Sequence, residues 1–189
     1  MTLSADVLRE IDAFVRGGFE SSERIIEILS EEMYKPSELD AAEIEAAVSF
    51  AIATLEEEKK TWPRTTDCDR LNIAFAALPA KGIVALQNAG YTQSDGYEDI
   101  MEAFESHANQ SSVVGYCYYH GQDLERAISG SGLFLSFEPM NASKEETEGL
   151  RVGKLIVEEF ERFFKVEWSG KFNQRIFIPD IDWKRRRNL

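Results

Sequence analysis

Residues 113–125, VVGYCYYHGQDLE, bring a thiol, three phenols, an imidazole, a carboxamide and two carboxylates into thirteen positions. The simplest chemistry for this stretch is a Cys117 nucleophile activated by His120 as a base. Side chains alternate along a strand, so Cys117 and His120 point to opposite faces of the predicted strand 113–119. The two are therefore poorly placed to form a thiolate–imidazole pair. His120 remains a candidate because functional groups are often carried where a strand ends in a loop.

A second chemical cluster is TTDCDRL, residues 65–71, directly before a predicted helix. Thr66 or Asp67 fits the helix N-cap, and Asp69 lies near the positive end of the helix dipole. On the functional interpretation, the same helix start lowers the pKa of the Cys68 thiol and makes a reactive thiolate. The two neighbouring carboxylates oppose that effect. Capping is the favoured interpretation, and a reactive cysteine is the alternative.

HGQDLE, residues 120–125, begins another predicted helix, in which Gln122 or Asp123 serves as the N-cap. If this helix start lies beside the one at residue 67, polar groups from both converge on a pocket near the sheet edge. His120 would then act as acid or base, and Cys68 as nucleophile. The candidate catalytic residues are Cys68, His120 and Asp123, and the candidate binding residues are Asp67, Asp69, Tyr118 and Gln122.

The spacing of possible ligands predicts no metal site and no cofactor. Two histidines and two isolated cysteines give no CxxC, HxxxH or HExxH pattern. The run SGSGLF, residues 129–134, leads from a helix into a strand, whereas a phosphate loop leads from a strand into a helix. A Gly-x-Ser-x-Gly elbow is also missing, so nothing supports a serine hydrolase.

The net charge of −13 is the strongest compositional signal. Such a surface repels phosphate backbones and favours basic partners, so we expect a basic protein partner and no nucleic acid. Residues 1–62 hold 15 acidic and 6 basic side chains, a net of −9 that leaves −4 for residues 63–189. The tail KRRRNL, residues 184–189, is basic. We expect it to be solvated or folded back on the acidic surface, in preference to binding nucleic acid or an acidic partner.

Bulk composition predicts a globular cytoplasmic protein. Hydrophobic residues make up 43% of the chain, and no apolar run approaches the roughly 20 residues that a membrane helix needs. The sequence begins MTLSADVLREIDAF, which lacks the basic start and apolar stretch of a secretory signal. Two cysteines in such a chain indicate free thiols in a reducing compartment.

The spacing of apolar residues predicts a helical N-terminal segment over 1–62 and an α+β domain over 63–189. Helices are expected at 5–16, 19–34 and 40–61, the first closed by the glycines at 17 and 18. After residue 63, helices alternate with short apolar runs that are rich in β-branched and aromatic residues. Strands are expected at 82–88, 113–119, 132–138, 165–169 and 174–181. The fold class is therefore α+β, with one sheet of about five strands, helices packed on it and a ferredoxin-like arrangement.

Four stretches together resemble a bacterial domain family of unknown function over most of the chain. They are TWPRTTDCDRLNIAFAAL, GIVALQNAG, GYCYYHGQDLE and VEWSG…RIFIPDIDWKRR. In such relatives the loop after the first strand is often rich in cysteine, whereas the corresponding stretch here, GYTQSDGYED, has none. The closing part of the chain is also similar to the ribonuclease E inhibitor family, which implies a protein-binding regulator.

Two functions follow from these observations. The first is a non-enzymatic interaction or regulatory protein that uses an acidic surface to engage a basic partner. The alternative is a small enzyme or ligand-binding protein with a pocket near Cys68 and His120.

Overall fold

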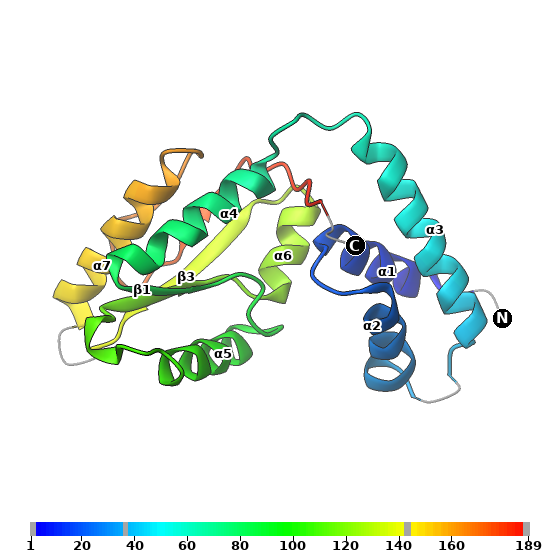
Figure 1. Ribbon diagram of the computed structural model, residues 1–189, viewed down its shortest axis with the longest axis horizontal. Helices are drawn as coiled ribbons and strands as arrows, with labels where there is room; N and C mark the ends of the chain where they lie inside the picture. Colours follow the sequence, from blue (N-terminus) through cyan, green and yellow to red (C-terminus); the bar gives the residue numbers. More distant parts are fainter. Residues whose placement is uncertain (1–2, 36–37, 142–144, 187–189) are drawn as a thin grey trace. The chain divides into compact units, whose positions relative to one another are not determined.

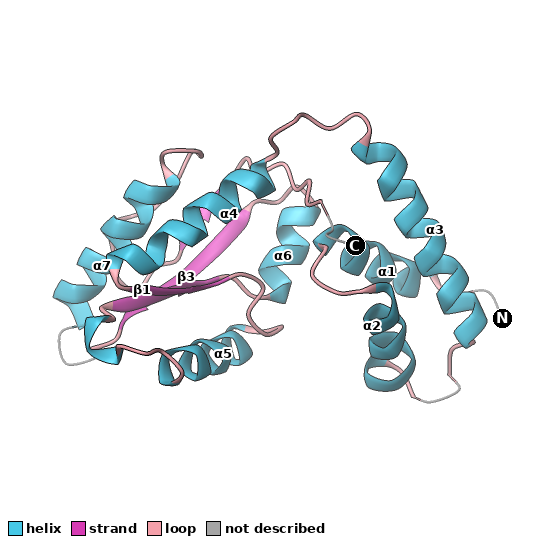
Figure 2. Cartoon of the chain, viewed as in Figure 1, coloured by secondary structure: helices cyan, strands magenta, loops and turns pink. Residues whose placement is uncertain are grey.

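The computed structural model describes residues 3–35, 38–141 and 145–186. Contacts divide the chain into two compact units (Figure 1). The first comprises residues up to Thr66 together with those from Lys184 onward, and the second comprises Asp67–Trp183. Helices dominate the first unit, and the strands of the described ranges lie in the second (Figure 2). The expected domains over 1–62 and 63–189 stay a prediction.

The first unit contains helices α1 (Ala5–Gly17), α2 (Ser22–Glu27) and α3 (Ala41–Lys59), with a π-helical turn (Ile28–Met33) after α2. Each α-helix begins at a side chain that satisfies a free backbone N–H. Ser4, Ser21 and Asp40 accept from N–H groups three residues ahead, at 3.3, 3.1 and 3.0 Å. These short polar residues therefore fix where the helices start.

The first unit has its own hydrophobic core. Its buried members are Val7, Ile11, Val15, Ile25, Leu29, Ile44, Val48 and Leu55. Their spacing of three or four residues along each helix produces one apolar face per helix. At the edge of this core, the Arg16 guanidinium bonds both Glu58 oxygens at 2.8 and 2.9 Å. This pair sets the last turn of α1 beside the last turn of α3.

The second unit alternates helices and strands in the order α4, β1, α5, β2, α6, β3, α7, β4. The helices are α4 (Asp67–Ala77), α5 (Gln93–Glu105), α6 (Gly121–Ile128) and α7 (Glu145–Phe160), and 3₁₀ turns occupy Leu78–Lys81 and Gln110–Ser112. The strands are β1 (Ile83–Leu86), β2 (Gly115–Tyr118), β3 (Leu133–Pro139) and β4 (Ile176–Ile178). As the sequence predicts, this part of the chain is α+β.

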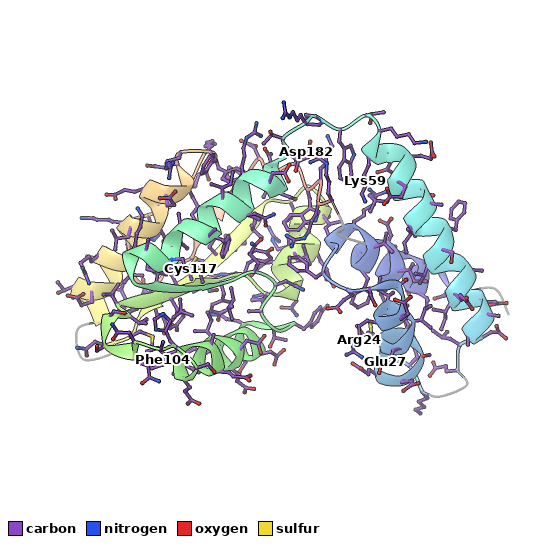
Figure 3. The ribbon with its side chains drawn as sticks, in the orientation of Figure 1. Arg24, Glu27, Lys59, Phe104, Cys117 and Asp182 are labelled. Carbon is purple, nitrogen blue, oxygen red and sulfur yellow. The ribbon has the colours of Figure 1, made fainter. Side chains whose placement is uncertain are left out.

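The strands form one mixed sheet in the order β1-β2-β3-β4. β1 and β2 are parallel and are connected through α5, whereas β2 to β3 and β3 to β4 are antiparallel. In this register Cys117 lies between Ala85 and Phe137 on the neighbouring strands. Figure 3 shows Cys117 inside the second unit, along the sheet.

Helices cover both faces of the sheet, with α4 and α7 on one side and α5 on the other (Figure 1). Gly115 packs so closely on α7 that a β-carbon there would lie 2.7 Å from a Val152 methyl. Tyr118, three residues along β2, instead meets Gly96 of α5. α6 lies on the same side of the sheet as α5. The Arg126 guanidinium lies 5.2 Å from the centroid of the Phe134 ring, and Phe134 and Ser136 share one face of β3. Ser136 is paired with Tyr118, whose side chain packs against α5.

The structure corrects the expected strand count, since the described residues form four strands and not about five. Segment 165–169 contributes only a single bridge, between Glu167 and Phe177. The reason lies in Trp168, whose indole N–H donates to the carbonyls of Lys171 and Gln174, both at 3.1 Å. These bonds curl the chain into a loop and end the pairing. The ferredoxin-like arrangement is not confirmed.

Candidate functional site

A buried polar cluster lies at the start of α6, on the α5 side of the sheet. We define it as His120, Asp123, Ser136 and Arg175. His120 takes the N-cap position of α6, with extended backbone angles of φ −105° and ψ 176°. The predicted caps, Gln122 and Asp123, lie two and three residues further along, in the first turn, because β2 ends at Tyr118 and α6 begins at Gly121.

Asp123 is the centre of the cluster, with only 2% of its surface exposed. Its carboxylate lies 3.1 Å from His120 Nε2 and forms an ion pair with the Arg175 guanidinium. A buried carboxylate is tolerated only when it is paired in this way. The structure therefore joins two of the candidate catalytic residues, His120 and Asp123, directly.

Arg175, which sequence reasoning missed, comes from the residue just before β4. Its guanidinium lies 5.2 Å from the Phe134 ring centroid, and Nη2 also reaches the Phe134 carbonyl at 3.4 Å. Arg175 and Asp123 are 52 residues apart in the chain. No local pattern links residues at that distance, so only the packing of β4 against β3 reveals the pair.

Three buried polar atoms of the cluster make no hydrogen bond within the described residues. They are His120 Nδ1, Ser136 Oγ and Arg175 Nε. Ser136 lies opposite Tyr118 in the strand ladder, where burial raises the pKa of the Tyr118 phenol and Ser136 opposes that rise. A buried polar atom without a partner costs about 1–3 kcal/mol. Several in one place indicate a site for ordered water or a small polar molecule.

The electrostatics of the cluster keep the His120 imidazole neutral. Burial lowers the pKa of His120 below its ordinary value of 6.5, and Arg175 acts in the same direction, while Asp123 opposes them. Because the Asp123 carboxylate lies 3.1 Å from Nε2 and favours the ring proton there, the neutral ring presents Nδ1 as an acceptor. The cluster thus offers one acceptor at His120, one donor at Arg175 Nε and a hydroxyl at Ser136. That set suits an uncharged polar group.

The remaining residues predicted near His120 are Tyr118 and Gln122, and both form hydrogen bonds to backbone carbonyls. The Tyr118 hydroxyl donates to the Gln93 carbonyl at 2.8 Å, which ties β2 to the first turn of α5. Gln122 has an exposed side chain, and its backbone N–H donates to the Tyr91 carbonyl at 3.1 Å. Tyr118 therefore lies beside the polar cluster, whereas the Gln122 side chain points to solvent.

The residues predicted at the start of α4 are held in its first turn. The Asp67 carboxylate pairs with Arg70 at 2.6 Å and accepts from the Asp182 N–H at 3.0 Å. Cys68 is 1% exposed, and Asp69 is half-buried beside it. Asp67 thus anchors the segment after β4. Convergence of Cys68 with His120 stays a prediction.

The second thiol, Cys117, is fully buried, and burial raises the pKa of this thiol far above its usual range. A thiol in that state is a poor nucleophile. Within the described residues, no three histidine, cysteine or carboxylate side chains are grouped to hold a metal ion.

A shallow depression of about 340 Å³ opens at a different place in the second unit. Val113, Val114, Met140, Asn141 and Glu148 line it. None of the candidate catalytic or binding residues is among them. Among the helices of the described chain, none has both the length and the apolar composition to cross a membrane.

A second candidate surface is the outer face of α5. The helix carries five acidic side chains, at 95, 98, 99, 102 and 105, and no basic one. Asp95 belongs to the capping box of α5, and Asp99 accepts from the Gly90 N–H at 2.7 Å. The other three, Glu98, Glu102 and Glu105, are exposed and form no ion pair with the described residues. We call these three the α5 acidic row.

In the first unit, by contrast, several acidic side chains form ion pairs with nearby bases. Its helical bases are paired with nearby carboxylates, as Arg24 is with Glu27 on α2 (Figure 3). The other pairs are Arg9–Asp6, Arg16–Asp12, Arg16–Glu58, Arg24–Glu32, Lys59–Glu56 and Lys60–Glu57. The α5 acidic row has no such compensation, although sequence analysis placed most of the negative charge in residues 1–62.

A family model described as "Domain of unknown function (DUF6891)" matches residues 2–187, so the chain belongs to this family. This confirms the resemblance to a bacterial domain family of unknown function. No curated protein and no solved structure matches the chain.

Proposed function

We propose that this member of the DUF6891 family is a non-enzymatic interaction or regulatory protein that binds a basic protein partner through the α5 acidic row. The observation that carries the proposal is a helix of thirteen residues with five acids, no base and three exposed carboxylates that form no ion pair with any residue the structure describes. A protein with a net charge of −13 attracts cationic surfaces over long distances.

The spacing within the row favours a cationic partner. Glu98 and Glu102 are four residues apart, and Glu102 and Glu105 are three apart, so the like charges are neighbours on one helix face. Each such pair destabilises a helix by about 0.2–0.5 kcal/mol. Lysine or arginine side chains from a partner would remove that repulsion on binding.

Exposed aromatic rings accompany the row. Tyr97 on α5 is 45% exposed, and Tyr91, just before the helix, is 55% exposed. Tyrosine rings supply contact area at a low entropic cost and attract guanidinium groups through cation–π interactions. We therefore expect a partner segment that combines several basic residues, arginine among them.

The candidate chemical groups support the non-enzymatic assignment. Cys68 and Cys117 are both 1% exposed or less, and His120 is 4% exposed. Asp67 and Asp123 are engaged in ion pairs and backbone hydrogen bonds. Groups that hold the fold in this way are poorly placed to meet a substrate.

The test is affinity capture with a matched pair of variants. The first variant removes the three charges of the α5 acidic row through Glu98→Gln, Glu102→Gln and Glu105→Gln. The control variant removes three other exposed carboxylates through Glu31→Gln, Glu45→Gln and Glu161→Gln. Both variants therefore have the same net charge. Each protein is used for affinity capture from native lysate at about 50, 150 and 300 mM salt, and the captured proteins are identified by mass spectrometry. We expect a partner protein that binds the wild type and the control but does not bind the variant without the α5 acidic row. Retention should weaken as salt rises.

Two results would contradict the proposal. One is capture that is equally strong from the row variant and the control. The other is the lack of any protein whose retention depends on salt.

The second candidate function is a small enzyme or ligand-binding protein near Cys68 and His120. It is favoured by the three unsatisfied atoms on His120, Ser136 and Arg175. Native mass spectrometry of the purified chain, followed by extraction in organic solvent, should then release a small uncharged polar molecule. Ser136→Ala should lower its occupancy, and an apparent mass equal to that of the bare chain would exclude a retained ligand.

A further inference from the structure

The basic tail packs on the first unit in its described part, residues 184–186. The Arg185 guanidinium carbon lies 3.9 Å from the centroid of the Phe19 ring. Arg186 Nη2 donates to the Pro63 carbonyl at 2.6 Å. Lys184, Arg185 and Arg186 are all half-buried, although each carries a charge. The rest of the predicted tail, 187–189, lies outside the described residues.

The two contacts form what we call the Phe19–Pro63 surface. Phe19 follows the left-handed Gly18, φ 71°, that ends α1, and Pro63 follows the last turn of α3. The Arg16–Glu58 pair sets these two helix ends side by side. Helix C-termini carry partial negative charge, so their meeting point attracts cations. The net charge of −9 over residues 1–62 adds to this attraction.

Both contacts are better suited to arginine than to lysine. A planar guanidinium stacks on an aromatic ring and still directs N–H groups to a carbonyl, whereas an ammonium is compact and more strongly hydrated. Consecutive residues Arg185 and Arg186 use the ring and the carbonyl in turn. The Phe19–Pro63 surface is therefore suited to bind the side chains of two adjacent arginines in an extended segment.

We propose that the Phe19–Pro63 surface is a binding site for arginine-rich segments of other proteins, and that the tail occupies it as a displaceable ligand of the same chain. The site is distinct from the α5 acidic row, so it does not depend on that assignment. A tethered segment competes at an effective concentration of about 1 mM. A free segment with a Kd of about 0.1 mM for the vacant surface would be weakened roughly tenfold by that competition.

The experiment uses the full chain and a labelled peptide, GGKRRRNL, that carries the sequence of residues 184–189. Binding is followed by fluorescence anisotropy. The variant Arg185→Gln with Arg186→Gln vacates the surface and should bind the peptide roughly tenfold more tightly than the wild type. Adding Phe19→Leu to this variant should remove the gain. The peptide GGKKKKNL should bind more weakly than GGKRRRNL.

A matched control separates recognition from charge. Arg9→Gln with Lys60→Gln changes the net charge by the same amount, at two exposed residues of the first unit. It should leave peptide affinity close to that of the wild type. Equal gains in the control and the vacated variant would overturn the proposal, as would a vacated variant that binds no better than the wild type.

Two further variants cover the remaining outcomes. If the double variant does not fold, Arg185→Lys keeps the charge, loses the stacked guanidinium and should raise peptide affinity in part. An unchanged affinity in that variant overturns the proposal. The variant without the α5 acidic row should keep the tenfold difference, so failure of one proposal is distinguished from failure of the other.

Discussion

His120 Nε2 lies 3.1 Å from the Asp123 carboxylate, and both side chains are at least 95% buried. The imidazole is neutral in the folded state because burial lowers the pKa of His120 more than Asp123 raises it. In the unfolded chain the same group takes up a proton near its ordinary pKa of 6.5. The protonation of His120 is therefore linked to unfolding.

Stability should fall on acidification through this linkage. Below pH 6.5 the unfolded chain binds a proton that the folded chain does not, so the free energy of unfolding decreases until the folded pKa is reached. One proton contributes at most about 1.4 kcal/mol per pH unit. Urea unfolding from pH 7.5 to 5.5 should show a smaller slope for His120→Gln than for the wild type. The exposed His107→Gln is the control, and equal slopes in all three proteins would rule out the linkage.

Neither thiol should react in the folded protein. Cys68 is 1% exposed and Cys117 is fully buried, with its pKa raised by burial. An aromatic disulfide reagent at pH 8 should therefore detect almost no thiol in the native protein and two thiols per chain after denaturation in guanidinium. Fast modification of one thiol in the native protein would show that a cysteine is accessible, and it would favour the hypothesis that Cys68 acts as a nucleophile.

Helix boundaries were predictable where the signal is local. The glycines at 17 and 18 were expected to close the first helix, and Gly18 is its C-cap because glycine adopts the left-handed conformation without steric cost. The cap of α6 was assigned wrongly, since β2 is shorter than the predicted strand and the helix begins at Gly121.

Long-range features were not predictable. Arg175 reaches Asp123 only after β4 pairs with β3, and nothing in the sequence around either residue indicates the pair. Segment 165–169 has the composition of a strand, but the hydrogen bonds of Trp168 limit its pairing to one bridge. Tertiary contacts decided both outcomes.

Gly96 should be intolerant of a side chain. A β-carbon there would lie 2.5 Å from the Tyr118 ring and 2.7 Å from the Ala89 carbonyl. Gly96→Ala should destabilise the protein by about 1–3 kcal/mol through overpacking, despite the better helix propensity of alanine. Ser94→Ala, at an exposed position of the same helix, should be neutral or stabilising. Urea midpoints measure both, and a stabilised Gly96→Ala would disprove the close packing.

Removing one charge from the α5 acidic row should stabilise the protein. Glu102→Gln relieves repulsion with both Glu98 and Glu105, which is worth about 0.4–1 kcal/mol at low salt. Salt should shrink the gain by screening. Glu45→Gln, which has no like charge three or four residues away on α3, should change little. A loss of stability in Glu102→Gln would mean that this carboxylate has a favourable partner.

The hydrogen bond from the Asp182 N–H to the Asp67 carboxylate brings the first and last parts of the second unit together. In sequence, this unit is inserted within the first, and the chain passes between them twice, at 66/67 and at 183/184. A nick at 183/184 leaves both units in one covalent fragment, whereas a nick at 66/67 leaves residues 1–66 held to the remainder by noncovalent contacts alone, such as those of Arg185 with Phe19 and of Arg186 with Pro63. Liberating the second unit intact would require two cleavages.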